Sequence, residues 1–167
     1  MGLPLHRRLV LVTGGSSGIG DLEQSADDIA ATGVATPVVL CGHNERLRRR
    51  VQSAGSPSIA LGWVDDMALV LGAVDAVVQN SGGFTSLETL AAGLPILTYR
   101  CLAGHGEMNA DALERAGLVV WIKTRAGLRE GLNRALATSG AGLWQAGQQG
   151  RPDVVEAVFA ESRIRAA

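Results

Sequence analysis

Residues 80–95, Asn-Ser-Gly-Gly-Phe-Thr-Ser-Leu-Glu-Thr-Leu-Ala-Ala-Gly-Leu-Pro, hold the residue types in this chain best suited to binding a phosphorylated ligand. After an apolar run, they place two glycines and the hydroxyls of Thr85 and Ser86 at the start of an expected helix. A helix N-terminus presents unpaired N–H groups and a partial positive charge, and glycine lets a phosphate approach the backbone closely. Glu88 follows one turn later, where a carboxylate is poorly placed for phosphate but well placed for a ribose diol. The segment therefore predicts a site for a nucleotide diphosphate.

The same segment resembles the donor-binding motif of the family 28 glycosyltransferases, in which Gly-Gly-x-Thr-Ser-x-Glu holds the diphosphate of UDP and its ribose. The resemblance extends over roughly residues 8–137. It implies an α/β fold with a Rossmann-like, doubly wound parallel sheet of about six strands, the carboxy-terminal half of a GT-B fold. The residues that match the motif at fixed spacing are Gly82, Gly83, Thr85, Ser86, Glu88, Gly93 and Pro95.

The resemblance also implies an activity. Members of this family transfer a hexose from a UDP-sugar to a lipid-type acceptor, with inversion and without a metal ion or another cofactor. Their general base belongs to an amino-terminal acceptor domain, which we expect to be missing from this chain and to act in cis or in trans. We therefore expect the chain to bind UDP or a UDP-hexose and to transfer little by itself.

Five loops after expected strands supply the nucleotide-sugar site that the resemblance implies. The first two, 13–20 and 41–44, read Thr-Gly-Gly-Ser-Ser-Gly-Ile-Gly and Cys-Gly-His-Asn. The third, 62–67, would present the backbone of Val64 to the uracil. The fourth is the segment 80–95 described above, and the fifth, 104–110, would contact hexose hydroxyls. The implied binding residues are Gly14, Gly15, Ser16, Gly42, His43, Val64, Ser81, Gly82, Gly83, Phe84, Thr85, Ser86, Glu88, His105 and Asn109.

Several roles in these loops stay open. His43 stands where relatives often carry arginine, so it is either a ligand contact or a structural residue. Trp63 belongs to the core, to the rim of the site or to a base stack, and the core is the expected place. His105 is a candidate for sugar or diphosphate binding and for catalysis, whereas Glu107 either caps a helix or touches the sugar.

The first loop also resembles the cofactor loop of short-chain dehydrogenases, and residues 80–82 resemble their Asn-Ala-Gly strand end. An NADP-dependent oxidoreductase is therefore an alternative. Those enzymes use a Tyr-x-x-x-Lys pair for proton transfer. Here the only tyrosine, Tyr99, is followed four positions later by Ala103, and the only lysine, Lys123, is distant. A non-catalytic nucleotide-binding module with the same site is a further alternative.

Composition excludes other classes of protein. The 167 residues are 47% hydrophobic and 19% charged, which is typical of a globular chain. The net charge of −1 argues against a nucleic-acid partner. No apolar run reaches the length of a membrane span, and residues 1–8 lack the apolar core of a signal peptide, so a cytoplasmic location is expected. The arginines of 46–50 predict a solvated helix face or, alternatively, a peripheral contact with the inner face of an anionic membrane.

Apolar runs alternate with helical patterns along the chain, which predicts parallel strands joined by crossover helices. Such sheets are covered on both faces and bind ligands at the carboxyl ends of their strands. The expected strands span 9–13, 37–41, 58–61, 76–79, 95–99 and 118–122.

Helix starts are predicted from capping residues, with Asn44 as one N-cap and Asp65 or Asp66 as another. The pattern divides the chain into a nucleotide-sugar-binding domain, 1–140, and a hinge with a packed helix, 141–167. The expected helices span 21–31, 44–54, 86–92, 108–116, 124–136 and 152–165, with a short additional helix that ends at 71.

Overall fold

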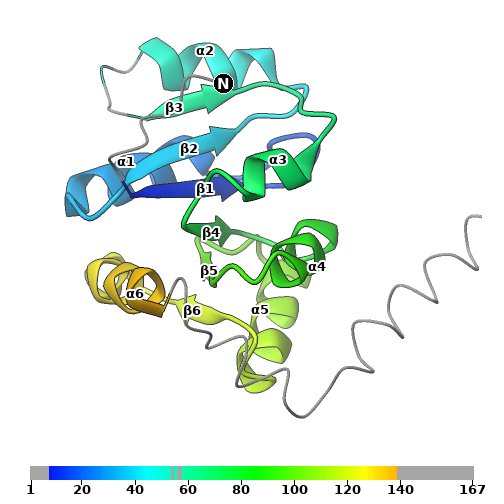
Figure 1. Ribbon diagram of the computed structural model, residues 1–167, viewed down its shortest axis with the longest axis vertical. Helices are drawn as coiled ribbons and strands as arrows, with labels where there is room; N and C mark the ends of the chain where they lie inside the picture. The colour runs from blue at the N-terminus through cyan, green and yellow to red at the C-terminus, as the bar shows by residue number, and fades with distance from the viewer. Residues whose placement is uncertain (1–7, 54, 56–57, 139–167) are drawn as a thin grey trace, which may run out of the picture.

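The computed structural model describes residues 8–53, 55 and 58–138, and shows one parallel sheet between two layers of helices (Figure 1). Within this range the strand order is β3-β2-β1-β4-β5-β6, and all neighbouring strands run parallel. Ligands in such doubly wound sheets bind where the strand order reverses, here between β1 and β4. The predicted fold class is confirmed. The strands are β1 (Leu9–Thr13), β2 (Thr36–Leu40), β3 (Ile59–Leu61), β4 (Ala76–Gln79), β5 (Ile96–Tyr99) and β6 (Val120–Ile122).

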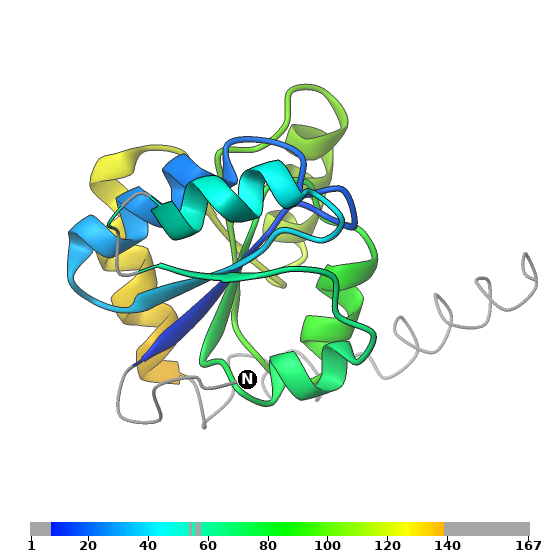
Figure 2. The same ribbon diagram turned by 90° about the horizontal axis from the view of Figure 1, so that it is seen from above.

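Helices cover both faces of the sheet, as Figure 2 shows with α1 in blue and α6 in orange on one side and α3 and α4 in green on the other. Leu22, Leu47 and Leu128 bring α1, α2 and α6 into one core cluster. Val70 of α3 and Leu90 of α4 belong to the clusters of the opposite face. The helices are α1 (Leu22–Thr32), α2 (Glu45–Ser53), α3 (Met67–Leu71), α4 (Phe84–Ala91), α5 (His105–Arg115) and α6 (Arg125–Thr138).

The central strand β1 is buried on both sides, because its side chains alternate between the two cores. Val10 and Val12 pack with α1, α2 and α6, whereas Leu9 and Leu11 pack with α3. Thr13 ends the strand with the same alternation as Leu9 and Leu11. The last side chain of β1 is therefore placed on the face that α3 and α4 cover.

The N-caps that the sequence predicts at the starts of α2 and α3 are confirmed. The side chain of Asn44 accepts a hydrogen bond from the Leu47 N–H at 2.9 Å, at the start of α2. At the start of α3, Asp66 accepts from the Leu69 N–H at 3.1 Å. These side chains replace intrahelical partners that the first turn lacks.

Two helices begin earlier than the sequence predicts. Helix α4 starts at Phe84 rather than at residue 86, and α5 starts at His105 rather than at residue 108. Each follows a glycine, Gly83 or Gly104, and neither has a side-chain cap. Without a capping side chain the sequence carries no signal for the first turn. The expected helix at 152–165 and the hinge that begins at 141 lie outside the described residues.

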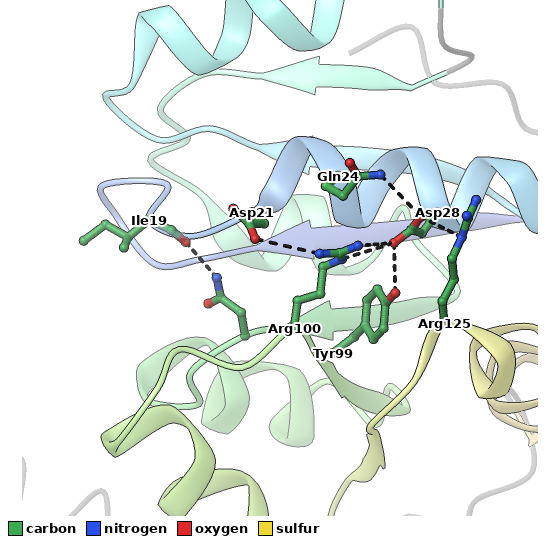
Figure 3. Close-up of polar contacts among 8 residues, drawn as sticks. Ile19, Asp21, Gln24, Asp28, Tyr99, Arg100 and Arg125 are labelled. Atoms are coloured by element: carbon green, nitrogen blue, oxygen red, sulfur yellow. Dashed lines mark hydrogen bonds and ion pairs between the residues drawn. The ribbon is translucent and has the colours of Figure 1, made fainter.

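A buried carboxylate joins three elements on the α1 face of the sheet (Figure 3). Asp28 of α1, with a side chain only 1% exposed, accepts a hydrogen bond from the Tyr99 hydroxyl at 2.8 Å. The Arg100 guanidinium, just after β5, donates to the same oxygen from Nε at 3.1 Å and from Nη2 at 2.9 Å. Arg125, the first residue of α6, forms an ion pair with the other oxygen at 2.9 Å. Asp28 therefore ties α1, the end of β5 and α6 together.

The pKa of Asp28 reflects two opposing influences. Burial raises the pKa, but the hydrogen bonds from Arg100 and Tyr99 and the positive charges of Arg100 and Arg125 together outweigh burial, and the pKa falls below its ordinary value of 3.8. The carboxylate is ionised at neutral pH, and its partners satisfy the charge.

Candidate functional site

A pocket of about 320 Å³ lies at the carboxyl ends of β1 and β2, on the face covered by α3 and α4. This volume is within the range of small-molecule sites. The loops after β1, β2 and β3 line it, together with the first turns of α3 and α4. The structure thus brings together residues from four of the five predicted loops. The predicted binding residues in its lining are Gly15, Ser16, Gly42, Val64, Gly82, Phe84, Thr85 and Glu88.

The loops after β1 and β2 pack backbone to backbone at one side of the pocket. Gly42 has a φ of +58°, and a Cβ at this position would overlap the carbonyl oxygen of Ser16. The N–H of His43 donates to the same carbonyl at 3.3 Å. Gly14 is buried beneath the first loop, where a Cβ would meet the Ile19 carbonyl, so this glycine shapes the loop and does not line the pocket.

At the opposite side of the pocket, α4 begins with an uncapped first turn. Gly82 and Gly83 have φ values of +75° and +105°, which favour glycine. Gly83 is the N-cap residue and provides no side chain for the first N–H groups. These groups carry the positive end of the helix dipole, and Phe84 and Thr85 of the same turn line the pocket. This turn can accept an anion.

The two hydroxyls predicted for phosphate binding have different surroundings. Thr85 lines the pocket. Ser86 is buried, and its hydroxyl donates to Oε1 of Gln79 on β4. The carbonyl of Gly83 accepts from the Ser86 N–H at 3.0 Å. Ser86 therefore anchors α4 to the sheet, and of these two residues only Thr85 lines the pocket.

Among the described residues, Glu88 is the only ionisable one in the lining of this pocket. It lies one turn into α4 and is partly exposed. Within the described residues its carboxylate makes no hydrogen bond and no ion pair. A carboxylate without a protein partner can accept hydrogen bonds from ligand hydroxyls.

Trp63 corrects one expectation from the sequence. The expected core position is wrong, because its side chain is 51% exposed and lines the pocket. Its indole stacks on the His43 ring with centroids 4.1 Å apart and planes 9° apart, and its Nε1–H donates to Asp65 at 2.8 Å. His43 itself does not line the pocket.

The fifth predicted loop lies beside the pocket rather than in its lining. His105 is the exposed first residue of α5, and Glu107 is exposed within the first turn. The amide of Asn109 donates to the Ser81 carbonyl at 3.0 Å, next to the glycine pair that starts α4. This bond connects α5 with the loop after β4.

Four lining residues were not among the binding residues implied by the resemblance: Thr13, Leu40, Trp63 and Met67. Thr13 and Leu40 are the last residues of neighbouring strands, paired in register. Thr13 is 1% exposed, and its hydroxyl has no hydrogen-bond partner among the described residues. The alternation of side chains along β1 is the only signal in the sequence that places Thr13 on this face.

Other arrangements are absent from the described part of the chain. No group of three or more histidine, cysteine or acidic side chains lies close enough to hold a metal ion there. None of the helices at 8–138 is both long and apolar enough to cross a bilayer. The Tyr99 hydroxyl, which a dehydrogenase would need in its active site, is buried on Asp28 at the other face of the sheet.

Comparison with known proteins shows the family of this chain. Residues 9–140 match the model of the glycosyltransferase family 28 C-terminal domain. A Mycobacterium bovis protein, named UDP-N-acetylglucosamine–N-acetylmuramyl-(pentapeptide) pyrophosphoryl-undecaprenol N-acetylglucosamine transferase, is 37% identical over 120 residues, 67% of this chain and 28% of that protein. The uncharacterized glycosyltransferase YkoN of Bacillus subtilis is 31% identical over 114 residues, 66% of this chain and 31% of its own. The chain thus spans less than a third of these relatives.

Solved structures agree on the fold. The calicheamicin glycosyltransferase CalG4 superposes with a TM-score of 0.65 at 18% identity, over 95% of this chain and 41% of its own. A ugt transferase from Siraitia grosvenorii in complex with UDP gives a TM-score of 0.59 at 18% identity, over 84% of this chain and 39% of its own. The chain belongs to glycosyltransferase family 28, whose C-terminal domain it carries.

Proposed function

We propose that this domain binds the UDP part of a UDP-sugar and is the donor half of an inverting, metal-independent glycosyltransferase that transfers a hexose to a lipid-type acceptor. The observation that carries the proposal is Glu88. It is the sole carboxylate of the pocket, it has no partner among the described residues, and it lies one turn beyond an uncapped helix start. This arrangement fits a ribose diol beside a diphosphate.

The order of elements across the pocket supports the same ligand. Trp63 and Val64, which follow β3, give one side an apolar and aromatic surface suited to a uracil ring. The start of α4, which follows β4, gives the other side free N–H groups suited to the diphosphate. The end of β1 lies between them. The ribose, which joins base to diphosphate, would occupy this central position near Glu88.

In the proposed mechanism this domain stabilises the leaving group. As the glycosidic bond breaks, negative charge develops on the departing diphosphate. The first turn of α4 and the Thr85 hydroxyl would stabilise that charge through dipoles already in place, which is electrostatic preorganisation. The pocket offers no general base for the acceptor hydroxyl, because Glu88 is assigned to the ribose. That base would come from an amino-terminal acceptor domain, in cis or in trans.

A lipid-type acceptor is supported by the name of the mycobacterial relative, which specifies a pyrophosphoryl-undecaprenol substrate. Lipid acceptors reside at a membrane, so we extend the proposal to a peripheral location at its cytoplasmic face. Arg46 and Arg49 are exposed on α2 and form no ion pair within the described residues, so they are available to anionic lipid headgroups. Co-sedimentation with vesicles of anionic and zwitterionic lipids tests this. Equal binding of the wild type and of Arg46→Glu/Arg49→Glu to anionic vesicles would contradict the proposed contact.

Titration calorimetry with UDP tests the nucleotide site, with NADPH as the comparison ligand. We expect Glu88→Ala to weaken UDP binding by about 1.5–3 kcal/mol, the worth of a charge-assisted hydrogen bond. Glu130→Ala, an exposed acid on α6 at the opposite face, is the matched control and should bind UDP normally. Undiminished UDP affinity in Glu88→Ala would remove Glu88 from the site. Binding of NADPH without UDP would favour the oxidoreductase instead.

Transfer itself separates the enzyme from a non-catalytic nucleotide-binding module. We expect hexose transfer to a lipid acceptor when an acceptor domain of the family is supplied together with this chain. A domain that binds UDP-sugar but supports no transfer under that condition would be a binding module.

A further inference from the structure

The indole of Trp63 is exposed and yet held in one orientation. Its flat face stacks on the imidazole of His43, with a centroid separation of 4.1 Å and nearly parallel planes. Its edge is fixed by the hydrogen bond from Nε1 to Asp65. A side chain on the surface ordinarily keeps its rotamer freedom, whereas these two contacts restrain both the tilt and the rotation of the ring.

The side chain of His43 contacts the pocket lining through this indole. Trp63 belongs to the pocket lining and His43 does not. One face of the indole is covered by the imidazole, and half of the side chain stays accessible. The imidazole thus supports one face of an indole that lines the pocket.

The turn that carries His43 is rigid. Gly42 adopts a positive φ and packs directly on the Ser16 carbonyl, and the His43 N–H donates to that carbonyl at 3.3 Å. The next residue, Asn44, caps α2 through its side chain. The imidazole is therefore presented from a segment fixed on both sides, and it can hold the indole in place.

We propose that His43 is a positioning residue that holds the Trp63 indole ready to stack on the base of the bound nucleotide. The inference rests on the proposed function, in which the ligand is a UDP-sugar. Stacking on an aromatic side chain contributes strongly to the binding of a nucleobase. A ring that is already ordered loses less freedom when the base arrives, so the backing by His43 strengthens binding.

The test compares His43→Ala with His43→Phe in the full chain. Calorimetry gives the affinities for UDP, uridine and inorganic diphosphate. We expect His43→Ala to weaken UDP and uridine alike, by about three- to tenfold, the size expected when one more side chain must be ordered on binding. Diphosphate binding should not change, because the proposal assigns Trp63 to the base alone. Phenylalanine restores a flat ring and should restore the affinity.

A double-mutant cycle with Trp63→Ala connects the two residues. Once the indole is gone, His43→Ala should cause no further loss of affinity. Two results would overturn the inference: an unchanged uridine affinity in His43→Ala, or a loss that extends to diphosphate and that phenylalanine does not rescue, which would make His43 a phosphate contact. A wild-type chain that fails to bind UDP would refute the proposed function itself, and the inference with it.

Discussion

Replacing Asp28 with alanine removes the carboxylate that joins α1 to β5 and α6. The Tyr99 hydroxyl, buried with Asp28, loses its acceptor, and hydrogen bonds to a charged group contribute roughly 1.5–3 kcal/mol each. Loss of the ion pairs with Arg100 and Arg125 costs less stability, because 32% and 68% of their side chains are exposed and water can replace the carboxylate. Removing one partner from a buried pair destabilises by about 3–5 kcal/mol, and the exposure of the arginines favours the lower end, about 3 kcal/mol.

Urea denaturation followed by far-UV circular dichroism measures this change in the free energy of unfolding, and thermal denaturation measures the melting temperature. A loss of about 3 kcal/mol lowers the melting temperature by roughly 6–12 °C in a chain of this size. Tyr99→Phe removes only the hydroxyl and should destabilise by about 1.5 kcal/mol, the lower end of the range for a hydrogen bond to a charged group, because Arg100 still donates to the same carboxylate oxygen. In the Asp28→Ala background, Tyr99→Phe should cause little further loss of stability, because it removes a hydroxyl that has already lost its acceptor. Full additivity would show that Tyr99 and Asp28 are not coupled, and an Asp28→Ala variant as stable as the wild type would refute the assigned role.

Two further predictions concern single groups. The pKa of Asp28 is lower in the folded chain than its ordinary value of 3.8. The Asp28 carboxylate therefore contributes fully to stability above the ordinary pKa, and this contribution is lost as the pH falls through the folded pKa. The stability difference between wild type and Asp28→Ala should therefore be constant from neutral pH to about pH 5 and should shrink below about pH 4, as acid denaturation series of both proteins will show. Thr13→Val keeps the shape of a side chain whose buried hydroxyl has no partner in the described part of the chain, and should raise the free energy of unfolding by about 1 kcal/mol. A loss of stability in the same denaturation assay would mean that the hydroxyl has a partner in solution.

Much of the fold follows from local sequence signals. Each strand is an apolar run that ends near glycine or a polar residue, and the parallel arrangement follows from the helices between strands. Asn44 and Asp66 were recognisable as caps because their side chains accept from the turn that follows them directly. The motif around Glu88 was also recognisable, because its residues lie close together in the sequence, at the start of one helix.

Contacts between distant segments were not predictable in this way. The Arg100 guanidinium reaches Asp28 across 72 residues of sequence, and no local pattern connects them. Trp63 follows a strand and was expected in the core, whereas its position over His43 depends on how two loops meet above the sheet. Thr13 reads as the end of a buried strand, and its place in the pocket appears only when α3 and α4 are known to lie on its face.

The described helices differ in how their first turns are capped. Helices α2 and α3 satisfy their first turns with Asn44 and Asp66, whereas α1, α4 and α5 begin without a side-chain cap. Of these three helices, α4 is the one whose first turn lines the pocket, and its N-cap residue is Gly83. Gly83 has φ and ψ of +105° and −151°, a conformation that is essentially restricted to glycine, so a serine or asparagine cap could not occupy it without strain. Glycine at an N-cap is only a few tenths of a kcal/mol less favourable than a capping side chain. The domain thus loses little stability by leaving these N–H groups open, and it does so at the helix whose first turn lines the pocket with Glu88.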